Sequence, residues 1–221
     1  MRRNNVKMKL QQRVPSVGAT LAWPSPQLVE FCALAGFEWV LMDAEHGPID
    51  VRTCEEMVRA AEGAGIVPMV RVPTNDRIQI MQYLQVGVTG IAVPHVNSRA
   101  DAERVVAAVK YYPEGSRYAD TGARAADYGL LRPNHELYQE ANRETMIVIW
   151  VEERRALENL DEILASGKAL VGETRDAASL PALLEAGALL ISTSAKHLWY
   201  FAMKDYLASF EECSRGAPVR S

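Results

Sequence analysis

Short runs of Val, Ile and other apolar residues alternate along this chain with longer segments whose apolar residues recur every three or four positions. The short runs are typical of buried strands, and the longer period is typical of helices that bury one face. Strands are expected at 17–21, 39–43, 68–72, 90–94, 146–151, 169–171 and 188–192. Helices are expected at about 26–35, 51–63, 75–85, 99–110, 154–165, 177–186 and 196–210. This alternation predicts an α/β fold with a parallel sheet.

Two architectures fit such a pattern: a (β/α)8 barrel of the TIM type and an open, doubly wound sheet. The run at 146–151 is apolar nearly throughout, as expected of a strand that is covered on both faces. No Gly-x-Gly-x-x-Gly turn follows the first expected strand, so an open dinucleotide-binding sheet would lack its usual phosphate-binding loop. The barrel is therefore favoured.

The chain has 221 residues, 48% of them hydrophobic and 24% charged, which suits one soluble barrel domain over 1–221. The ends, at 1–13 and 214–221, are expected to be flexible. The net charge of -4 comes without a cluster of Lys and Arg, so nucleic acid is not an expected partner. No apolar run reaches the roughly 18 residues of a membrane span, and no signal peptide is expected. Three cysteines without paired spacing suggest a reducing, cytoplasmic setting.

Ionisable residues follow four consecutive expected strands. In parallel β/α folds the carboxyl ends of the strands form one rim, where active sites lie. The second strand leads into Asp43, Glu45 and His46, the third into Arg71, the fourth into His95, and the fifth into Glu152 and Glu153. We therefore predict that these side chains meet at one site.

Four of these residues suit defined chemical roles. The imidazole of His46 can take up and release a proton, while Asp43 can hold its other ring nitrogen. Arg71 offers a fixed fork of donors for a carboxylate or an enolate oxygen. Glu152 is an oxygen ligand suited to Mg²⁺ or Mn²⁺. Together they predict acid–base chemistry on a small anion beside a divalent metal.

Plainer interpretations stand beside these. Arg71 and Glu152 could simply pair with each other across the barrel mouth, and His46 could be a turn residue. For His95 and His135 a solvated loop position is the favoured interpretation. His197 is expected in a packed terminal helix or an oligomer contact.

Several longer strings mark a family. They are 35–48 (Ala-Gly-Phe-Glu-Trp-Val-Leu-Met-Asp-Ala-Glu-His-Gly-Pro), 68–73 (Pro-Met-Val-Arg-Val-Pro), 90–94, 112–117 (Tyr-Pro-Glu-Gly-Ser-Arg), and Glu152 with 156–163. In this order they resemble the HpcH/HpaI family of class II pyruvate aldolases, over about residues 15 to 165 and again further on.

The resemblance implies a homo-oligomeric (β/α)8 barrel, a trimer or hexamer, in which a divalent metal and a pyruvate enolate take part in reversible addition to an aldehyde. It implies that Arg71 steadies the enolate oxygen, that His46, oriented by Asp43, moves a proton, and that Glu152 binds the metal. Trp150 stands where the family has a glutamine, so it is assigned to substrate binding. Retro-aldol cleavage, aldol addition and decarboxylation of a small keto acid all fall within this chemistry.

One segment of the family pattern is missing. The Gly-Pro-x-Asp-Leu string that supplies the family's second metal-binding carboxylate does not occur. In one register a whole βα unit is absent. In a rival register, 171–176 replaces the missing string and Asp176 becomes a weak candidate for the second ligand. Two functions follow: a metal-assisted lyase, or a catalytically silent or repurposed relative that binds a small carboxylate without metal.

Overall fold

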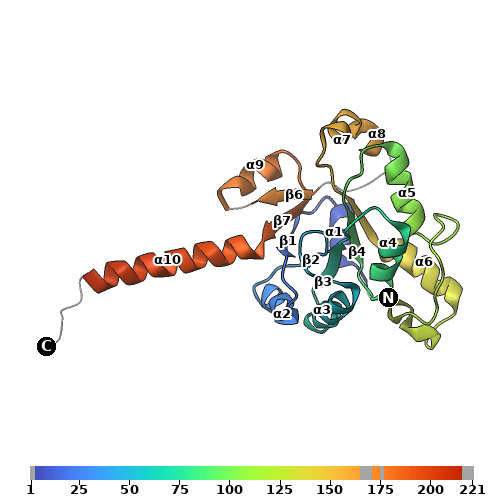
Figure 1. Cartoon of the computed structure of the whole chain (residues 1–221), viewed down its shortest axis with the longest axis horizontal. Coiled ribbons are helices and arrows are strands. Elements are labelled where there is room, and N and C mark those ends of the chain that lie inside the picture. The colour runs from blue at the N-terminus through green and yellow to red at the C-terminus, as the bar shows by residue number, and fades with distance from the viewer. Residues whose placement is uncertain (1–2, 165–170, 175–176, 216–221) are drawn as a thin grey trace.

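A seven-stranded sheet forms the centre of the molecule (Figure 1). The structure is a computed structural model of the chain, and it describes residues 3–164, 171–174 and 177–215. Within these residues the strand order is β5-β4-β3-β2-β1-β7-β6, and each neighbouring pair is parallel. The strands are β1 (Ser16–Leu21), β2 (Trp39–Asp43), β3 (Val67–Arg71), β4 (Gly90–Val93), β5 (Met146–Ile149), β6 (Val171–Thr174) and β7 (Leu190–Ser194).

Helices connect and cover these strands. They are α1 (Asn5–Gln11), α2 (Pro26–Leu34), α3 (Val51–Ala64), α4 (Arg77–Gln85), α5 (Arg99–Val109), α6 (Asn134–Glu144), α7 (Arg154–Glu158), α8 (Leu160–Leu164), α9 (Leu180–Glu185) and α10 (Ala195–Arg215). The seven strands overlap the predicted ones, with shifts at their ends. Helices α2, α3, α4, α5, α9 and α10 lie where helices were predicted, and the helix predicted at 154–165 is two short helices, α7 and α8. Positions 169–170 of the sixth expected strand lie outside the described residues. No described helix is both long enough and apolar enough to cross a membrane.

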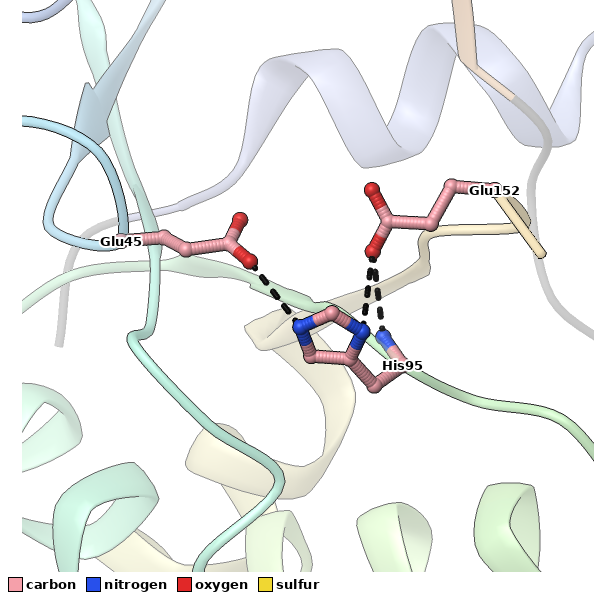
Figure 2. Close-up of side chains that lie close together, drawn as sticks. All are labelled: Glu45, His95 and Glu152. Atoms are coloured by element: carbon pink, nitrogen blue, oxygen red, sulfur yellow. Dashed lines mark hydrogen bonds and ion pairs between the residues drawn. The ribbon is translucent and has the colours of Figure 1, made fainter.

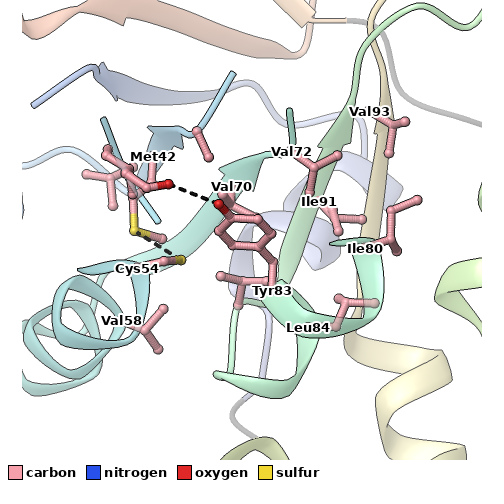
Figure 3. Close-up of a cluster of buried hydrophobic side chains, with 14 of the residues drawn as sticks. Met42, Cys54, Val58, Val70, Val72, Ile80, Tyr83, Leu84, Ile91 and Val93 are labelled. Atoms are coloured by element: carbon pink, nitrogen blue, oxygen red, sulfur yellow. Dashed lines mark hydrogen bonds between the residues drawn. The ribbon is translucent and has the colours of Figure 1, made fainter. Parts of the chain in front are cut away.

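Side chains on the two faces of the sheet belong to two different hydrophobic clusters. In β2, Val40 and Met42 join the cluster between the sheet and the surrounding helices, whereas Trp39 and Leu41 join the cluster on the opposite face. Figure 3 shows part of the first cluster, where Met42 and Val70 pack beside Cys54. Successive residues of a strand point to opposite faces, so β2 is buried on both sides. Burial on both faces explains why the strands read as continuous apolar runs.

The hydrophobic cluster on the face of the sheet that is turned away from the surrounding helices is called the inner cluster here. Trp39 can fill it because a glycine lies opposite this residue on the neighbouring strand. Its side chain is completely buried, and Gly18 of β1 pairs with it in the parallel register. A Cβ atom on Gly18 would lie 2.1 Å from the nearest atom of the indole ring. Only glycine leaves the room that this ring occupies.

The amino end of the sheet is covered by a helix that the sequence did not predict. α1 lies in the segment that was expected to be flexible, yet its Val6 is only 1% exposed and packs with the inner cluster. Asn4 caps this helix by accepting a hydrogen bond from the N–H of Lys7. A second unforeseen helix, α6, lies between positions 110 and 146, where neither a strand nor a helix was expected.

The two outer strands of the described sheet are β5 and β6, and they follow one another among the strands in sequence order. A closed barrel of this type has eight strands and would place one more between them. The sheet therefore matches the register in which one βα unit is absent.

The last helix, α10, projects away from the rest of the molecule (Figure 1). Seven large apolar side chains along it are at least 40% exposed: Leu198, Trp199, Tyr200, Phe201, Met203, Tyr206 and Leu207. A run of this kind on a free helix is typical of a surface that meets another protein chain.

Candidate active site

The best-defined contact at the carboxyl end of the sheet joins Asp43 and Arg71. These residues end β2 and β3, and the parallel register pairs them directly. Arg71 donates from Nε to Oδ1 of Asp43 at 3.0 Å and from Nη2 to Oδ2 at 2.6 Å. Both residues are buried. The result is a two-pronged ion pair that fixes the guanidinium in one orientation.

Each partner shifts the pKa of the other. Burial raises the pKa of Asp43, but the hydrogen bonds from Arg71 and from the main chain of His46 outweigh burial and hold this pKa below its usual value. Burial also works against the charged form of Arg71, while its hydrogen bonds to Asp43 and the charges of Asp43 and Glu45 raise its pKa. The pair is therefore ionised at neutral pH.

His46 is not oriented in the way that the sequence predicted. Oδ1 of Asp43 accepts the main-chain N–H groups of Glu45 and His46, each at 3.2 Å, rather than the ring of His46. The ring points elsewhere: its Nε2 lies 3.8 Å from Oε2 of Glu45, and the side chain is 67% exposed. The expected Asp43–His46 dyad is wrong because Arg71 occupies both oxygens of the aspartate.

Glu45 links the two halves of the site. Its side chain is 8% exposed and lies between Arg71, whose Nε is 3.2 Å from Oε2, and His95, whose Nε2 is 3.3 Å from Oε1. Oε2 is buried and accepts no hydrogen bond of good geometry. A buried carboxylate oxygen left in this state favours an additional positive partner.

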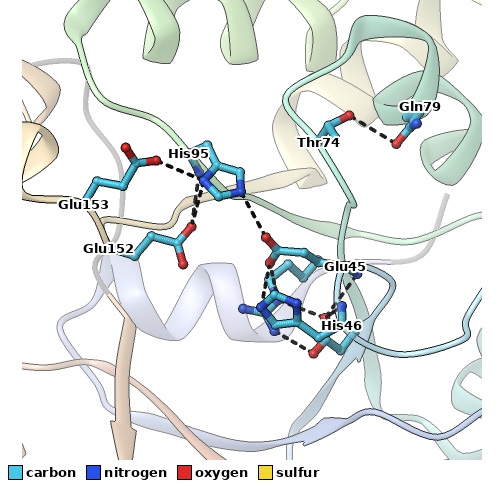
Figure 4. Close-up of polar contacts among 9 residues, drawn as sticks. Glu45, His46, Thr74, Gln79, His95, Glu152 and Glu153 are labelled. Atoms are coloured by element: carbon cyan, nitrogen blue, oxygen red, sulfur yellow. Dashed lines mark hydrogen bonds and ion pairs between the residues drawn. The ribbon is translucent and has the colours of Figure 1, made fainter.

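His95 is the residue that the sequence analysis undervalued. Its main-chain N–H donates to Oε1 of Glu152 at 3.3 Å, and its Nδ1 lies 3.0 Å from Oε1 of Glu153. Figures 2 and 4 show the ring between the carboxylates of Glu45 and Glu152. The hydrogen bond to Glu153 and the charges of Glu152 and Glu45 raise the pKa of His95. The interpretation of His95 as a merely solvated loop residue is therefore wrong.

The backbone of His95 explains why the residue order, which places His95 at the end of a strand, did not predict its close contacts with these carboxylates. Its φ is 58°, in the left-handed region that few residues other than glycine adopt. This conformation turns the chain two residues after the end of β4, where the imidazole lies between the carboxylates of the rim. A φ value of this kind has no signature in the residue order.

Three of the side chains at this rim could together bind a metal ion. Glu45, His95 and Glu152 each offer one ligand atom, and these atoms all lie within 4.8 Å of one another. Two carboxylates and an imidazole are appropriate donors for a divalent cation. Asp176, the weak candidate for a second carboxylate, lies outside the described residues.

Two further expectations concern the neighbours of Arg71. The plainer pairing of Arg71 with Glu152 is not its main contact, since Asp43 and Glu45 are the carboxylates that lie against it. Trp150 does lie at the site, with the Cζ of Arg71 5.0 Å from the centre of its ring. A guanidinium over an aromatic ring at this distance is a favourable cation–π contact.

The two remaining histidines lie outside this cluster. His135 is exposed in α6, as expected of a solvated residue. His197 lies near the start of the projecting helix α10, and its Nδ1 is buried without a hydrogen-bond partner in the described structure.

Comparisons with known proteins identify the relatives of the chain. The model of the HpcH/HpaI aldolase/citrate lyase family matches residues 21–173. A 5-keto-4-deoxy-D-glucarate aldolase of Salmonella arizonae is 33% identical over 163 residues, 74% of this chain and 62% of that protein. The same enzyme of Salmonella gallinarum is 31% identical over 221 residues, 99% of this chain and 84% of that protein.

The fold is also that of a solved family member. The crystal structure of an HpcH/HpaI aldolase/citrate lyase family protein from Burkholderia cenocepacia superposes with a TM-score of 0.85 at 24% identity, covering 94% of this chain and 99% of that one. The predicted barrel-type fold and the predicted aldolase class of carbon–carbon lyase are both confirmed. The chain belongs to the HpcH/HpaI aldolase/citrate lyase family.

Proposed function

We propose that this chain catalyses the reversible aldol reaction of a small 2-keto acid with an aldehyde, through the enolate of pyruvate and with a divalent cation such as Mg²⁺ or Mn²⁺. The observation that carries the proposal is the fixed guanidinium of Arg71 beside the Glu45, His95 and Glu152 group. The names of the relatives, which are aldolases of a keto sugar acid, support the same chemistry.

Arg71 is the proposed anion-binding residue. Its described contacts to Asp43 and Glu45 use Nε and Nη2. Nη1 is then the donor for the carboxylate or the developing enolate oxygen of the substrate. A donor that is already held in place stabilises developing negative charge without first having to reorganise.

The metal-binding residues are Glu152, with Glu45 and His95 beside it. A divalent cation supplies positive charge to the keto oxygen as negative charge develops there. Trp150, stacked against Arg71, bounds the substrate position and keeps water from the guanidinium.

His46 is the proposed proton-transfer group. Its exposed ring beside Glu45 is free to reach a bound ligand. In the cleavage direction it takes the proton of the substrate hydroxyl as the carbon–carbon bond breaks and the aldehyde leaves. It then returns a proton to the methylene carbon of the enolate, which gives pyruvate. Because Asp43 is engaged by Arg71, Glu45 is the residue placed to steady the charged ring.

Assembly and location form the remaining part of the proposal. The seven apolar side chains exposed on α10 support a homo-oligomer, a trimer or hexamer, in which this helix is covered. The buried free thiols of Cys32 and Cys54 suit a reducing cytoplasm.

Deuterium exchange at the methyl group of pyruvate tests the reaction. In D₂O, NMR should show exchange when Mn²⁺ or Mg²⁺ is added, and the exchange should stop when a chelator is added. Exchange that continues after the chelator is added would contradict the role of the metal. No exchange under either condition would favour the silent relative.

The role of Arg71 is tested separately by titration with pyruvate. In Arg71→Ala the affinity should fall by about 100-fold, since a charged hydrogen bond contributes about 1.5–3 kcal/mol. The matched control is Arg52→Ala, because that guanidinium is 89% exposed on α3. Circular dichroism establishes that both variants fold. Unchanged affinity in a folded Arg71→Ala protein would exclude the anchoring role.

A further inference from the structure

We propose that His95 is a metal ligand in this chain and that, together with Glu45 and Glu152, it makes the site selective for Mn²⁺, Co²⁺ or Zn²⁺ over Mg²⁺. The inference rests on the proposed function, because it concerns the cation which that reaction uses. The inference goes beyond the proposed function by assigning a nitrogen ligand and a class of metal.

The first support is the position of the imidazole. His95 lies two residues after the end of β4, and its backbone is left-handed, with a φ of 58°. For a residue with a bulky side chain this conformation is costly, and such outliers gather at functional sites. The main-chain N–H of the same residue donates to Glu152 at 3.3 Å, so backbone and ring both face the carboxylates.

The second support is the balance of charge. The four carboxylates of Asp43, Glu45, Glu152 and Glu153 meet at this rim. Among the described residues, Arg71 lies against Asp43 and Glu45, the ring of His46 lies 3.8 Å from Glu45, and the imidazole of His95 lies within 3.5 Å of Glu45, Glu152 and Glu153. Arg71 pairs with Asp43 and, at 3.2 Å, with Glu45, while the carboxylates of Glu45, Glu152 and Glu153 all lie against one imidazole. A divalent cation neutralises this surplus, and a neutral imidazole can bind it.

The third support is Glu45. Its side chain is 8% exposed, its Oε1 lies 3.3 Å from Nε2 of His95, and its Oε2, 3.2 Å from Nε of Arg71, accepts no hydrogen bond. Burying a carboxylate oxygen without a full set of partners is costly, and a cation at this point would remove the cost.

The spacing of the ligand atoms suits one cation after small side-chain rotations. The three ligand atoms lie within 4.8 Å of one another, and ligands on opposite sides of a metal at about 2.1 Å are about 4.2 Å apart. The side chains of His95 and Glu152 are 54% and 30% exposed, so both can rotate toward a common centre. No movement of the strands is needed.

The imidazole determines the metal preference. Magnesium prefers oxygen ligands and water, whereas imidazole suits the later divalent metals. One nitrogen ligand beside two carboxylates therefore increases the affinity for Mn²⁺, Co²⁺ and Zn²⁺, in this rising order. The affinity for Mg²⁺ increases little.

Electron spin-echo spectroscopy with Mn²⁺ alone tests whether His95 is a ligand. The wild-type protein should show nitrogen modulation from a bound imidazole, and His95→Asn should lose it. Asparagine tolerates the left-handed conformation, so this variant keeps the turn. His46→Asn is the control and should retain the modulation. A wild-type signal without nitrogen, or a signal lost only in His46→Asn, overturns the proposal.

Calorimetric titration tests the selectivity without substrate. In His95→Asn the affinity for Co²⁺ should fall by about 10- to 100-fold, the loss that even an outer-shell partner can cause. The affinity for Mg²⁺ should change by less than about threefold. Equal losses for both metals overturn the selectivity.

These measurements distinguish a failure of the metal-ligand proposal from a failure of the proposed function. If His95 binds Mn²⁺ but pyruvate shows no exchange, the metal site stands and the aldolase proposal falls. If exchange depends on metal but no nitrogen is coordinated, the aldolase proposal stands and the role of His95 falls.

Discussion

The two ends of the central sheet use charged and polar groups in opposite ways. At the amino end, the ammonium groups of Lys7 and Lys110 both donate to the main-chain oxygen of Thr145, each at 3.1 Å. Asn4 donates to the main-chain oxygen of Thr89 at 2.9 Å. At the carboxyl end, carboxylates gather around one imidazole and one guanidinium. At the amino end the chain pairs its own donors and acceptors, whereas the carboxyl end is where we propose that a cation binds.

This difference separates stability from binding. Changes at the amino end and in the inner cluster should lower the free energy of unfolding and leave metal binding intact. Changes to the proposed metal ligands at the rim should weaken metal binding and leave the free energy of unfolding of the metal-free protein nearly unchanged.

The largest expected effect belongs to Trp39. Removing this completely buried ring in Trp39→Ala leaves a cavity in the inner cluster. The free energy of unfolding in urea should fall by about 4 kcal/mol. Trp39→Phe, which keeps most of the volume, should lose clearly less. A loss below about 1 kcal/mol in the alanine variant would show that the inner cluster does not carry the stability of the sheet.

The next effect concerns Glu152 at the rim. Mn²⁺ at a concentration 100 times its dissociation constant should raise the free energy of unfolding of the wild-type protein by about 2.7 kcal/mol. Glu152→Gln should lose most of this increment, while its stability without metal changes by less than about 0.5 kcal/mol. The control is Glu158→Gln, an exposed glutamate of α7 that should keep the increment. Equal stabilisation of Glu152→Gln and the wild type would contradict the proposed ligand.

The smallest effect is a pH dependence at the amino end. Burial raises the pKa of Glu144, but the main-chain N–H of Asn4, which donates at 2.9 Å, and the positive charges of Arg143 and Lys7 lower it below its usual value. The ionised carboxylate therefore stabilises the fold above the pKa of the unfolded state, and this stabilisation is lost as the pH falls through the folded-state pKa.

A comparison of Glu144→Gln with the wild type measures this contribution. Near pH 7 the wild type should be more stable by about 1 kcal/mol. The gap should narrow as the pH is lowered from about 5 toward 3. A gap that stays constant over this range would exclude the carboxylate as its cause. Glu140 is unsuitable as a control because it forms its own ion pair with Arg132, so the exposed Glu136 of α6 serves instead.

Much of the fold and the place of the site could be predicted because they depend on repeating patterns. The strands β2, β3, β4 and β5 are buried on both faces, so they read as apolar runs, and polar residues at the ends of neighbouring strands must share a rim. Asp43 and Arg71 meet for this reason. Their register also decides that Asp43 holds Arg71 and not the ring of His46. That outcome depends on pairing between strands, which the residue order alone does not give.

The elements that were missed depend on context instead of pattern. α1 is short and, among its residues, buries Val6 alone, so its apolar period is too brief to recognise. α6 does bury Leu137 and Ala141 four residues apart, but it lies in a stretch crowded with turn-forming residues. His95 was undervalued because its role follows from a left-handed backbone and from carboxylates far away in the sequence.

The close approach of Gly18 and Trp39 links two positions that evolution would otherwise vary separately. A larger residue at position 18 and an indole at position 39 exclude each other, since the added carbon would lie 2.1 Å from the ring. Among homologous chains we expect the two positions to change together. A larger side chain at position 18 should occur only where the side chain at position 39 is smaller.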